Sequence, residues 1–309
     1  MRGPTSIGLT TCPVCGSSRI TLWKRRNLSR DLTPEDLQIT DSRYGVTLTL
    51  YKCAACSFVF ADAAETGHLT ELYEQMIDSA YGASSENRAQ QMRPLLQVGI
   101  AALPRARTLL EIGAGSGLLV AEARRLGLDA VGVEPCKSVV EVARESHGVD
   151  LLQGTFPHPM LHGRQFDLVY LVDVIEHVAD PIALLSDSTR ALSPGGALVV
   201  VTPDVSSLAA RLLGRRWWHF RLAHVGYFNA RSMNQAACLA GLAIRSTRRA
   251  GWVFSVRYLA ERVSTYLPVG GVNRAAERFG PFRWLYDRVI PLNLHDSHIF
   301  VMSRKSGSR

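Results

Sequence analysis

Four of the six cysteines stand in two closely spaced pairs, Cys12-x-x-Cys15 and Cys53-x-x-Cys56. Two residues between paired thiolates let both sulfurs face one ion across a tight turn, and two such turns complete a tetrahedral four-thiolate zinc site. Because the protein would fill every coordination position, the zinc is expected to be structural. Disulfides and unrelated thiols are the alternatives, and a cytoplasmic chain would not hold structural disulfides.

The rest of this first region fits around the two pairs. The 37 residues between them exceed the usual ribbon spacing, so residues 26–45 are expected to form an inserted loop. The second pair lies in YKCAACSFVF, where alternating apolar residues predict a strand on each side. Cys136 and Cys238 stand alone in apolar stretches and are expected to be buried, inert thiols.

A second candidate site is the glycine-rich segment TLLEIGAGSG, residues 108–117. Gly113, Gly115 and Gly117 lie between an apolar run and a helical stretch, which predicts a strand, a tight loop and a helix. Leu118 stands where a dinucleotide fingerprint would need its last glycine. No G-K-[ST] follows, which excludes a nucleoside-triphosphate loop.

Two glutamates flank this loop. Glu111 lies two positions before the first glycine, where a carboxylate suits a cationic amino group better than a pyrophosphate. Glu134 ends the next apolar run, AVGVEP, 17 residues after Gly117. A carboxylate at such a strand tip can accept two hydrogen bonds from ribose hydroxyls. The alternative for Glu134 is an exposed residue without a role in binding.

A third group of residues could activate a substrate hydroxyl. Asp173, Glu176 and His177 follow the apolar run of DLVYLVDVIEHVADP, and His224 lies in WWHFRLAHVGYF. In one interpretation His177 or His224 is a general base, since an ordinary imidazole has a pKa of about 6.5. In a second, the four residues hold a divalent ion (Mg, Mn or Fe) that lowers the pKa of the hydroxyl. In a third, Glu176 and His177 only cap or pack a helix start.

These residues are placed by a chain that alternates short apolar runs with helical segments after Arg107. Strands that are apolar on both faces and separated by helices predict a doubly wound parallel α/β sheet. Two more candidate strands follow the first five; the seven runs are 108–112, 130–133, 149–152, 166–172, 197–201, 242–247 and 298–303.

Helices and insertions surround this predicted sheet. Residues 68–81 and 84–103 have helical spacing, and the stretch from about 252 to 294 is longer than a link between strands requires. That insertion can cover a substrate, pair two subunits as a homodimer, or rest on a lipid surface, and the sequence does not choose. An aromatic wall is expected to act as a lid rather than as core; its residues are Trp217, Trp218, Phe220, Tyr227 and Phe228.

The motifs resemble those of the class I S-adenosylmethionine (SAM) dependent methyltransferases. EIGAGSG looks like the first motif of that family, VGVEP like the second, and PGGALVVVTPD like its turn and fifth strand. DVIEHV and the 217–228 segment resemble quinone-biosynthesis-like O-methyltransferases and their zinc-ribbon relatives in sugar and polysaccharide pathways.

The resemblance covers about residues 105–304 and implies a Rossmann-like, seven-stranded sheet with its last strand antiparallel. Asp173 is also expected to contribute to the SAM site, because it lies at the carboxyl edge of the fourth strand, where doubly wound sheets build their sites. Many members carry an acidic residue near the adenine after the third strand, whereas this chain has Thr155 and Phe156, which could bond to and pack on that ring. The expected organisation is a zinc-ribbon-like module (1–65), a helical linker or lid (66–104) and a methyltransferase domain (105–309).

Composition sets limits on the remaining possibilities. With 309 residues, 47% hydrophobic and 20% charged, the chain has the content of an ordinary globular protein. It holds no apolar run of about 18 residues and no secretory signal pattern, so a cytoplasmic location is expected. The net charge of +8 fits a solvated helical face, attraction to phosphorylated or acidic partners or a membrane surface, or nucleic-acid binding.

The predicted function is methyl transfer from SAM, foremost O-methylation of a sugar, glycolipid or related small metabolite. The alternative acceptor is a quinone-like or polyketide phenol. A non-enzymatic alternative is a zinc-dependent nucleic-acid-binding protein, for which Lys24, Arg25, Arg26 and Arg30 lie near the first cysteine pair. That alternative leaves the glycine loop and its two glutamates without a purpose, so no stable nucleic-acid partner is expected.

Overall fold

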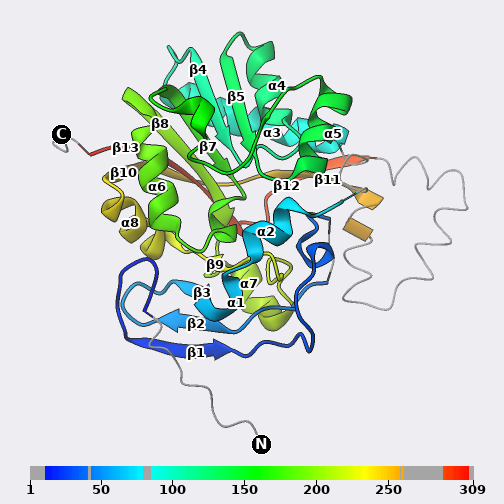
Figure 1. The fold of residues 1–309 in the computed structure, drawn as a ribbon, viewed down its shortest axis with the longest axis vertical. Helices are drawn as coiled ribbons and strands as arrows, with labels where there is room; N and C mark the ends of the chain where they lie inside the picture. Colours follow the sequence, from blue (N-terminus) through cyan, green and yellow to red (C-terminus); the bar gives the residue numbers. More distant parts are fainter. Residues whose placement is uncertain (1–10, 41–42, 79–84, 258, 261–287, 306–309) are drawn as a thin grey trace, which may run out of the picture.

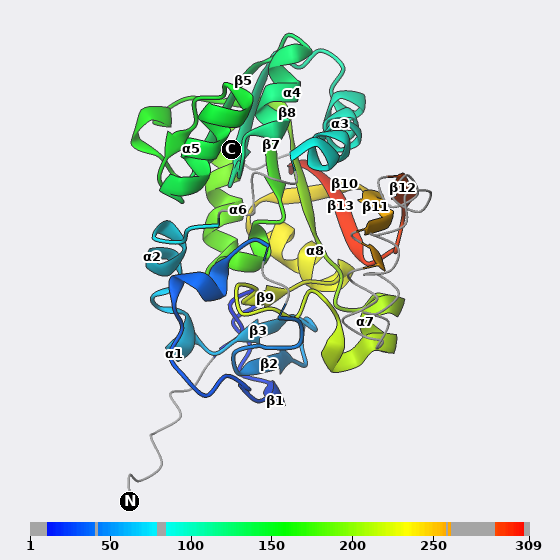
Figure 2. The ribbon, with the colours of Figure 1, turned by 90° about the vertical axis from the view of Figure 1, so that its right-hand side faces the viewer.

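A computed structural model describes residues 11–40, 43–78, 85–257, 259–260 and 288–305. Figures 1 and 2 show a large sheet with helices on both faces, and a smaller sheet next to one end of it. The large sheet has seven strands in the order β10-β13-β8-β7-β4-β5-β6. In the part of the chain that is described, no helix has the length and apolar character needed to cross a membrane.

The seven strands correspond to the seven predicted apolar runs. β4, β5, β6, β7 and β8 are mutually parallel, and β13 pairs antiparallel with both β8 and β10. The predicted doubly wound sheet with its last strand antiparallel is therefore confirmed. The strands are β4 (Thr108–Ile112), β5 (Asp129–Glu134), β6 (Leu152–Gln153), β7 (Phe166–Val172), β8 (Leu192–Pro203), β10 (Leu242–Arg249) and β13 (Ser297–Arg304).

The boundaries differ from the predicted ones in a few places. β6 has two residues, of which only Leu152 belongs to the 149–152 run, because Val149 and Leu151 are buried against the helices instead of joining the ladder. The predicted helix 68–81 is confined to α2 (Leu69–Glu74), and residues 79–81 lie outside the described residues. Most of the 252–294 insertion is also outside them; its described ends form the hairpin β11 (Trp252–Ser255) and β12 (Val289–Leu292).

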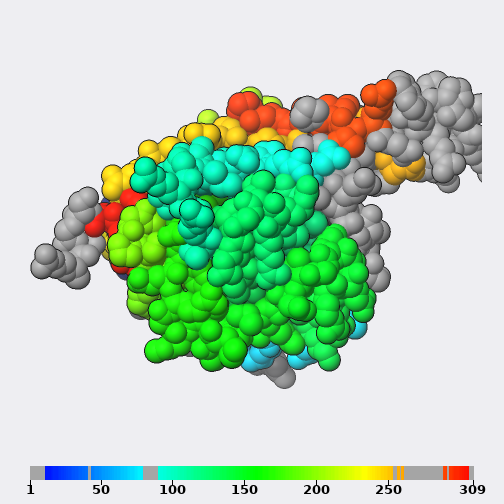
Figure 3. All heavy atoms as spheres, turned by 90° about the horizontal axis from the view of Figure 1, so that it is seen from above, coloured from blue at the N-terminus to red at the C-terminus, as the bar shows by residue number. Residues whose placement is uncertain are grey.

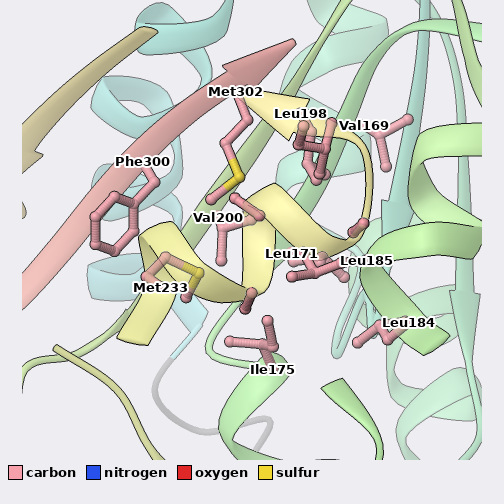
Figure 4. Close-up of a cluster of buried hydrophobic side chains, with 14 of the residues drawn as sticks. Val169, Leu171, Ile175, Leu184, Leu185, Leu198, Val200, Met233, Phe300 and Met302 are labelled. Carbon is pink, nitrogen blue, oxygen red and sulfur yellow. The ribbon is translucent and has the colours of Figure 1, made fainter. Parts of the chain in front are cut away.

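Alternate side chains of the central strands enter two separate cores. Val169 and Leu171 of β7 face α6 (Pro181–Arg190) and α8 (Ala230–Leu239), and Figure 4 shows them with Leu185, Val200 and Met233. Leu168 and Tyr170 face the helices of the opposite layer, which are α3 (Ser85–Ala102), α4 (Leu118–Arg125) and α5 (Lys137–His147). Because both faces of these strands are buried, their sequences are continuous apolar runs.

Helix α3 lies beside α4 and the β11–β12 pair, as the view from above shows (Figure 3). Tyr170 anchors it, since the phenol donates to the carbonyl of Leu96 at 2.9 Å and accepts from the N–H of Gly99 at 3.1 Å. A Cβ on Gly99 would collide with this hydroxyl, so glycine is needed for the helix to approach β7.

The small sheet combines the cysteine region with a distant segment. Its order is β1-β2-β3-β9, where β1 is Ile20–Lys24, β2 is Leu50–Cys53, β3 is Val59–Ala61 and β9 is Gly226–Tyr227. The remaining short elements are η1 (Pro34–Leu37), α1 (Ala63–Thr66), η3 (Pro159–Leu161), η4 (Ile175–His177), α7 (Leu208–Leu213) and η5 (Gly214–Arg216). Because β9 belongs to the predicted methyltransferase domain, the expected boundary at residue 65 does not separate the two sheets; the three-part division itself stays a prediction.

Candidate active site

The glycine loop joins β4 to α4 at the carboxyl edge of the large sheet. Gly113, Gly115 and Gly117 have φ angles of 70°, 52° and 73°, a left-handed backbone that residues with a Cβ rarely adopt. A Cβ on Gly113 would lie 2.5 Å from Cγ2 of Val174, so this position also lacks room for a side chain. The N–H of Gly113 donates to the carbonyl of Val133 at 2.8 Å, which ties the loop to β5.

Glu134 closes the loop from the tip of β5. Its Oε2 accepts from the N–H of Gly115 at 2.9 Å, and its Oε1 accepts from the N–H of Cys136 at 3.0 Å. Burial raises the pKa of Glu134 to about 7, although these two N–H groups and the Tyr73 hydroxyl act in the opposite direction. Each carboxylate oxygen has a second lone pair, so the fixed carboxylate can still accept from a ligand hydroxyl.

Glu111 lies within the sheet on β4, below the loop. It is 3% exposed, and its Oε2 has no hydrogen-bond partner among the described residues. Burial, followed by the negative charge of Glu134, raises the pKa of Glu111 well above its usual range. A cationic group beside Glu111 would reverse that shift and supply the missing partner. The two predicted carboxylates thus flank one loop.

The segment containing α2 covers this end of β5, which the sequence did not predict. Tyr73 bonds to Glu134, and the carbonyl of Met76 accepts from the Ser138 hydroxyl at 2.9 Å. Met76 is buried against Cys136 and Val139 at the start of α5. The helical linker or lid expected over residues 66–104 pointed to an element here, but the sequence did not assign it to this end of β5.

A second group of polar residues lies after β7, the neighbouring strand. Glu176, His177 and His224 each offer one ligand atom, and these atoms lie within 4.8 Å of one another. The His177 and His224 rings meet edge to face with their centroids 4.7 Å apart. We call these three residues the carboxylate–imidazole cluster. It joins η4, which follows β7, to the segment that leads into β9.

Backbone carbonyls fix which nitrogen of each ring is protonated. His177 Nδ1 donates to the carbonyl of Ala223 at 2.8 Å, so its Nε2 carries a free lone pair. His224 bonds to the backbone of His219, while its Nδ1 is buried without a partner among the described residues. Such a second hydrogen bond to a carbonyl is the usual arrangement around metal-binding histidines.

The electrostatics of the cluster act in two directions: the buried carboxyl favours a neighbouring cation, whereas the Arg221 guanidinium opposes positive charge on the imidazoles. Burial, and then the Asp173 carboxylate, raise the pKa of Glu176 well above its usual range. Burial and the Arg221 guanidinium lower the pKa of His177 to about 4, and burial lowers the pKa of His224 still more clearly. Glu176 Oε2 accepts from the Thr202 hydroxyl at 3.0 Å, whereas its buried Oε1 has no described partner. A cation here would oppose the shift of Glu176 and bind the free lone pairs.

Three predicted residues lie outside these groups. Asp173 directly follows β7 with a φ of 52° and an exposed side chain; its charge acts on Glu176, but it is not one of the cluster's ligand-bearing residues. Thr155 is exposed and Phe156 is half-buried against the core after β6. Their roles at the adenine, and that of Asp173 in binding, stay predictions.

The expected aromatic lid is largely core. Trp217, Phe220 and Tyr227 are 0%, 3% and 2% exposed and pack with Leu48 and Leu50 of the cysteine region. Phe228 is buried in the core shared with the large sheet. Arg215, Arg216 and Arg221 suggested a surface segment. Arg215 and Arg216 are indeed exposed, but Arg221 is half-buried and donates to the carbonyls of Gln38 and Ile39, while the rings pack inward.

The four paired cysteines come together as predicted. Cys12 and Cys56 have their Sγ atoms 3.5 Å apart, Cys15 and Cys53 have theirs 3.6 Å apart, and all four sulfurs lie within 4.8 Å. Zn–S bonds of about 2.3 Å in a tetrahedron would give sulfur separations of roughly 3.8 Å. The cluster therefore matches a zinc module. Cys136 is buried as predicted, but Cys238 is exposed near the end of α8.

The basic residues near the first cysteine pair are partly engaged within the protein. Arg26 pairs with Glu65 at 3.7 Å, and Arg30 pairs with Asp36 at 2.6 Å. These pairs reduce the free charge available to nucleic acid. The absence of a stable nucleic-acid partner stays a prediction.

Comparisons with known proteins agree with this geometry. A family model described as "Methyltransferase domain" matches residues 84–247, slightly more than half of the chain. The ubiquinone biosynthesis O-methyltransferase of Cereibacter sphaeroides is 38% identical over 116 residues, which are 35% of this chain and 47% of that protein. The protein of the same name from Azorhizobium caulinodans is 36% identical over 117 residues, 35% of this chain and 46% of that protein. The chain thus spans about half the length of these curated relatives.

A solved structure shares the fold at lower identity. It is a chain of the complex between the Haloferax volcanii Trm112 methyltransferase activator and a methyltransferase, with 15% identity and a TM-score of 0.51. The match covers 74% of this chain and 96% of that one. With the glycine loop, the two glutamates and the seven-stranded sheet in place, the match to the family model shows that this chain belongs to the class I SAM-dependent methyltransferases.

Proposed function

We propose that this protein transfers a methyl group from SAM to a hydroxyl oxygen of a small acceptor. The C–S bond of the sulfonium breaks, an O–CH₃ bond forms, the hydroxyl loses its proton, and S-adenosylhomocysteine leaves. The single observation that carries the proposal is the buried pair Glu111 and Glu134 around the glycine loop, with the carboxylate–imidazole cluster after the adjacent strand.

In this proposal the loop and its glutamates bind the donor. Glu134, fixed by two backbone N–H groups, accepts hydrogen bonds from the ribose hydroxyls. The negative charge of Glu111 attracts the ammonium group of the amino acid tail, which gives its buried oxygen a partner. The left-handed glycines keep the loop short enough for the backbone to approach the cofactor. SAM is an activated donor, so holding it in line with the acceptor supplies much of the rate.

The acceptor hydroxyl is proposed to meet the carboxylate–imidazole cluster. Glu176, His177 and His224 would hold a divalent ion, and such an ion lowers the pKa of a bound hydroxyl. The observations that support this assignment are the unpartnered, buried Glu176 Oε1 and His224 Nδ1. The carbonyls of Ala223 and His219 fix the imidazoles, and Thr202 fixes the carboxylate.

General-base catalysis is the second mechanism, and one observation supports it. His177 keeps a free Nε2, and with its pKa lowered to about 4 the ring is neutral at pH 7 and able to accept a proton. The same low pKa makes it a weak base, so an ion-free mechanism would suit an acidic phenol better than a sugar hydroxyl.

The names of the curated relatives favour the phenolic acceptor. They are ubiquinone biosynthesis O-methyltransferases, although the match spans less than half of each protein. A sugar or glycolipid acceptor rests on the resemblance to zinc-ribbon methyltransferases alone. We therefore place a quinone-like phenol first and a sugar hydroxyl second.

Mass spectrometry of acceptor panels tests this function. The full chain is incubated with SAM and either catechol-type phenols or sugars, and products are examined for one added methyl group. The proposal expects a methylated phenol that depends on SAM and is lost in Glu134→Ala. Assay after treatment with a chelator, followed by addition of Mg²⁺ or Mn²⁺, separates the two mechanisms. Activity that chelation leaves unchanged would exclude the ion.

The cysteine cluster is proposed to bind one structural zinc ion. Backbone N–H groups of Ala55 and Cys56 point to the Cys53 sulfur, and those of Val14 and Cys15 point to the Cys12 sulfur. These donors stabilise thiolates, which are the form that binds zinc. The four sulfurs fill a tetrahedron, so the ion would hold the fold and take no part in methyl transfer.

A further inference from the structure

A groove lies between the small sheet and α7, apart from the cofactor loop. It has a volume of about 440 Å³, which falls within the range of small-molecule pockets. Figures 1 and 2 show α7 next to the small sheet in both views. We call it the basic groove because four cations line it: Lys24, Lys52, Arg211 and Arg215.

The charge of the groove is not balanced from within. None of its lining residues is acidic, and within the described part of the chain none of the four cations forms an ion pair. Lys52, Arg211 and Arg215 are exposed at its rim. Four like charges around one hollow repel each other, and an anion bound among them would relieve that repulsion.

Lys24 makes the groove a built site rather than a cluster of surface charges. Its side chain is buried, 7% exposed, and its Nζ donates to the carbonyl of Gly45 at 2.9 Å and lies 4.9 Å from the centre of the Phe220 ring. A Cβ on Gly45 would lie 2.7 Å from the carbonyl oxygen of Arg215, so the lack of a side chain at Gly45 allows the two backbone segments to pack this closely. Burial, and then the charge of Arg215, lower the pKa of Lys24 to about 8. A buried ammonium without a carboxylate is costly, and an anionic ligand would stabilise it.

Neutral groups complete the lining. Ser57, Ser206 and Asn229 border the groove and carry hydroxyl or amide groups. Trp23 is 40% exposed at the edge, and its ring meets Phe220 edge to face at 5.5 Å. This aromatic surface next to cations suits a flat organic group attached to the anion.

We propose that the basic groove binds a phosphorylated small molecule, with its phosphate or diphosphate among the four cations and its organic part against the exposed Trp23 ring. Phosphate has the charge and the acceptor oxygens that lysine and arginine donors match. The proposal stands independently of methyl transfer, since neither glutamate of the cofactor loop lines the groove.

Calorimetry on the full chain tests the proposal. Inorganic pyrophosphate and uridine diphosphate are each titrated into the protein. Saturating S-adenosylhomocysteine is present, so that uridine diphosphate cannot bind at the cofactor loop. We expect both to bind, uridine diphosphate more tightly. The double variant Lys52→Glu/Arg211→Glu should weaken both by about tenfold or more, because each exposed cation is lost and replaced by a repelling charge.

The control variant is Arg105→Glu/Arg144→Glu, which changes the net charge equally at exposed positions outside the groove. It should bind both diphosphates as the wild type does, and both double variants should keep the wild-type affinity for S-adenosylhomocysteine, which shows that they fold. A third arm uses phosphatidylglycerol vesicles. If the wild type binds these vesicles but neither soluble diphosphate, and the groove variant loses the vesicle binding, the phosphate belongs to a lipid headgroup. No binding in either arm, or equal loss in the control variant, would overturn the proposal.

Discussion

The two clusters that could hold metal ions in this protein differ in their ligands and in their surroundings. The cysteine cluster has four ligands of one kind on two tight turns, each pair separated by two residues. The carboxylate–imidazole cluster has three ligands of two kinds: Glu176 and His177 come from η4, and His224 lies 47 residues after His177. Four ligands close a coordination sphere, whereas three leave a position for a substrate oxygen.

The two clusters are nonetheless linked through the backbone. The N–H of Ala61 on β3 donates to the carbonyl of Val225 at 2.8 Å, and the N–H of Val225 donates to the carbonyl of Glu176 at 2.8 Å. The side chains of Cys53 and Phe58 also belong to the core that contains Leu171. The cysteine cluster thus supports the segment that carries His224. We propose from this difference that the first cluster acts on stability and the second on chemistry.

The largest expected effect is on stability, from breaking the cysteine cluster. Cys53→Ser should lower the free energy of unfolding by more than about 3 kcal/mol, because binding of a structural zinc ion contributes strongly to folding. Denaturant unfolding with zinc analysis measures it, and the wild type should hold one zinc per chain. Cys238→Ser is the matched control, since this thiol is exposed and outside the cluster. An equal loss of stability in Cys53→Ser and Cys238→Ser would contradict the structural role of the cysteine cluster.

The next effect separates chemistry from binding. Glu176→Gln keeps the shape of the side chain and removes its charge, so kcat should fall by about a hundredfold while the affinity for S-adenosylhomocysteine stays unchanged. The matched control is Glu65→Gln, a carboxylate outside the cluster. If Glu176→Gln instead lowered stability as Cys53→Ser does and kept its kcat, the second cluster would be structural as well.

A smaller effect is expected at the edge of the second cluster. Asp173 is exposed, and the charge of its carboxylate raises the pKa of Glu176. Asp173→Asn should therefore change kcat by only about two- to fivefold, since solvent screens exposed charges. Steady-state kinetics measures it. A loss as large as that of Glu176→Gln would place Asp173 among the ligands and enlarge the cluster to four residues.

The parts of the molecule that local sequence determines could be predicted. A strand, a glycine loop and a second strand place Glu111 and Glu134 without knowledge of distant contacts, and a two-residue spacing brings paired cysteines to one point. The covering of Glu134 by Tyr73 could not be predicted, because it depends on where α2 packs. Two predictions were wrong for the same reason. Trp217 was expected in a lid but is buried, and Cys238 was expected to be buried but is exposed. Neighbouring apolar or charged residues in the sequence do not determine which side of a segment faces the core.

The most direct test of the central claim is calorimetric titration of S-adenosylhomocysteine into the wild type and Glu134→Gln at pH 6 and pH 8. Burial raises the pKa of Glu134 to about 7, so protonation competes with the ribose as the pH falls through that value. The wild type should bind about tenfold more weakly at pH 6 than at pH 8. Glu134→Gln should bind weakly and with little change between the two. Tight binding by the variant, or a wild type that does not bind at all, would contradict the assignment of this loop as the cofactor site.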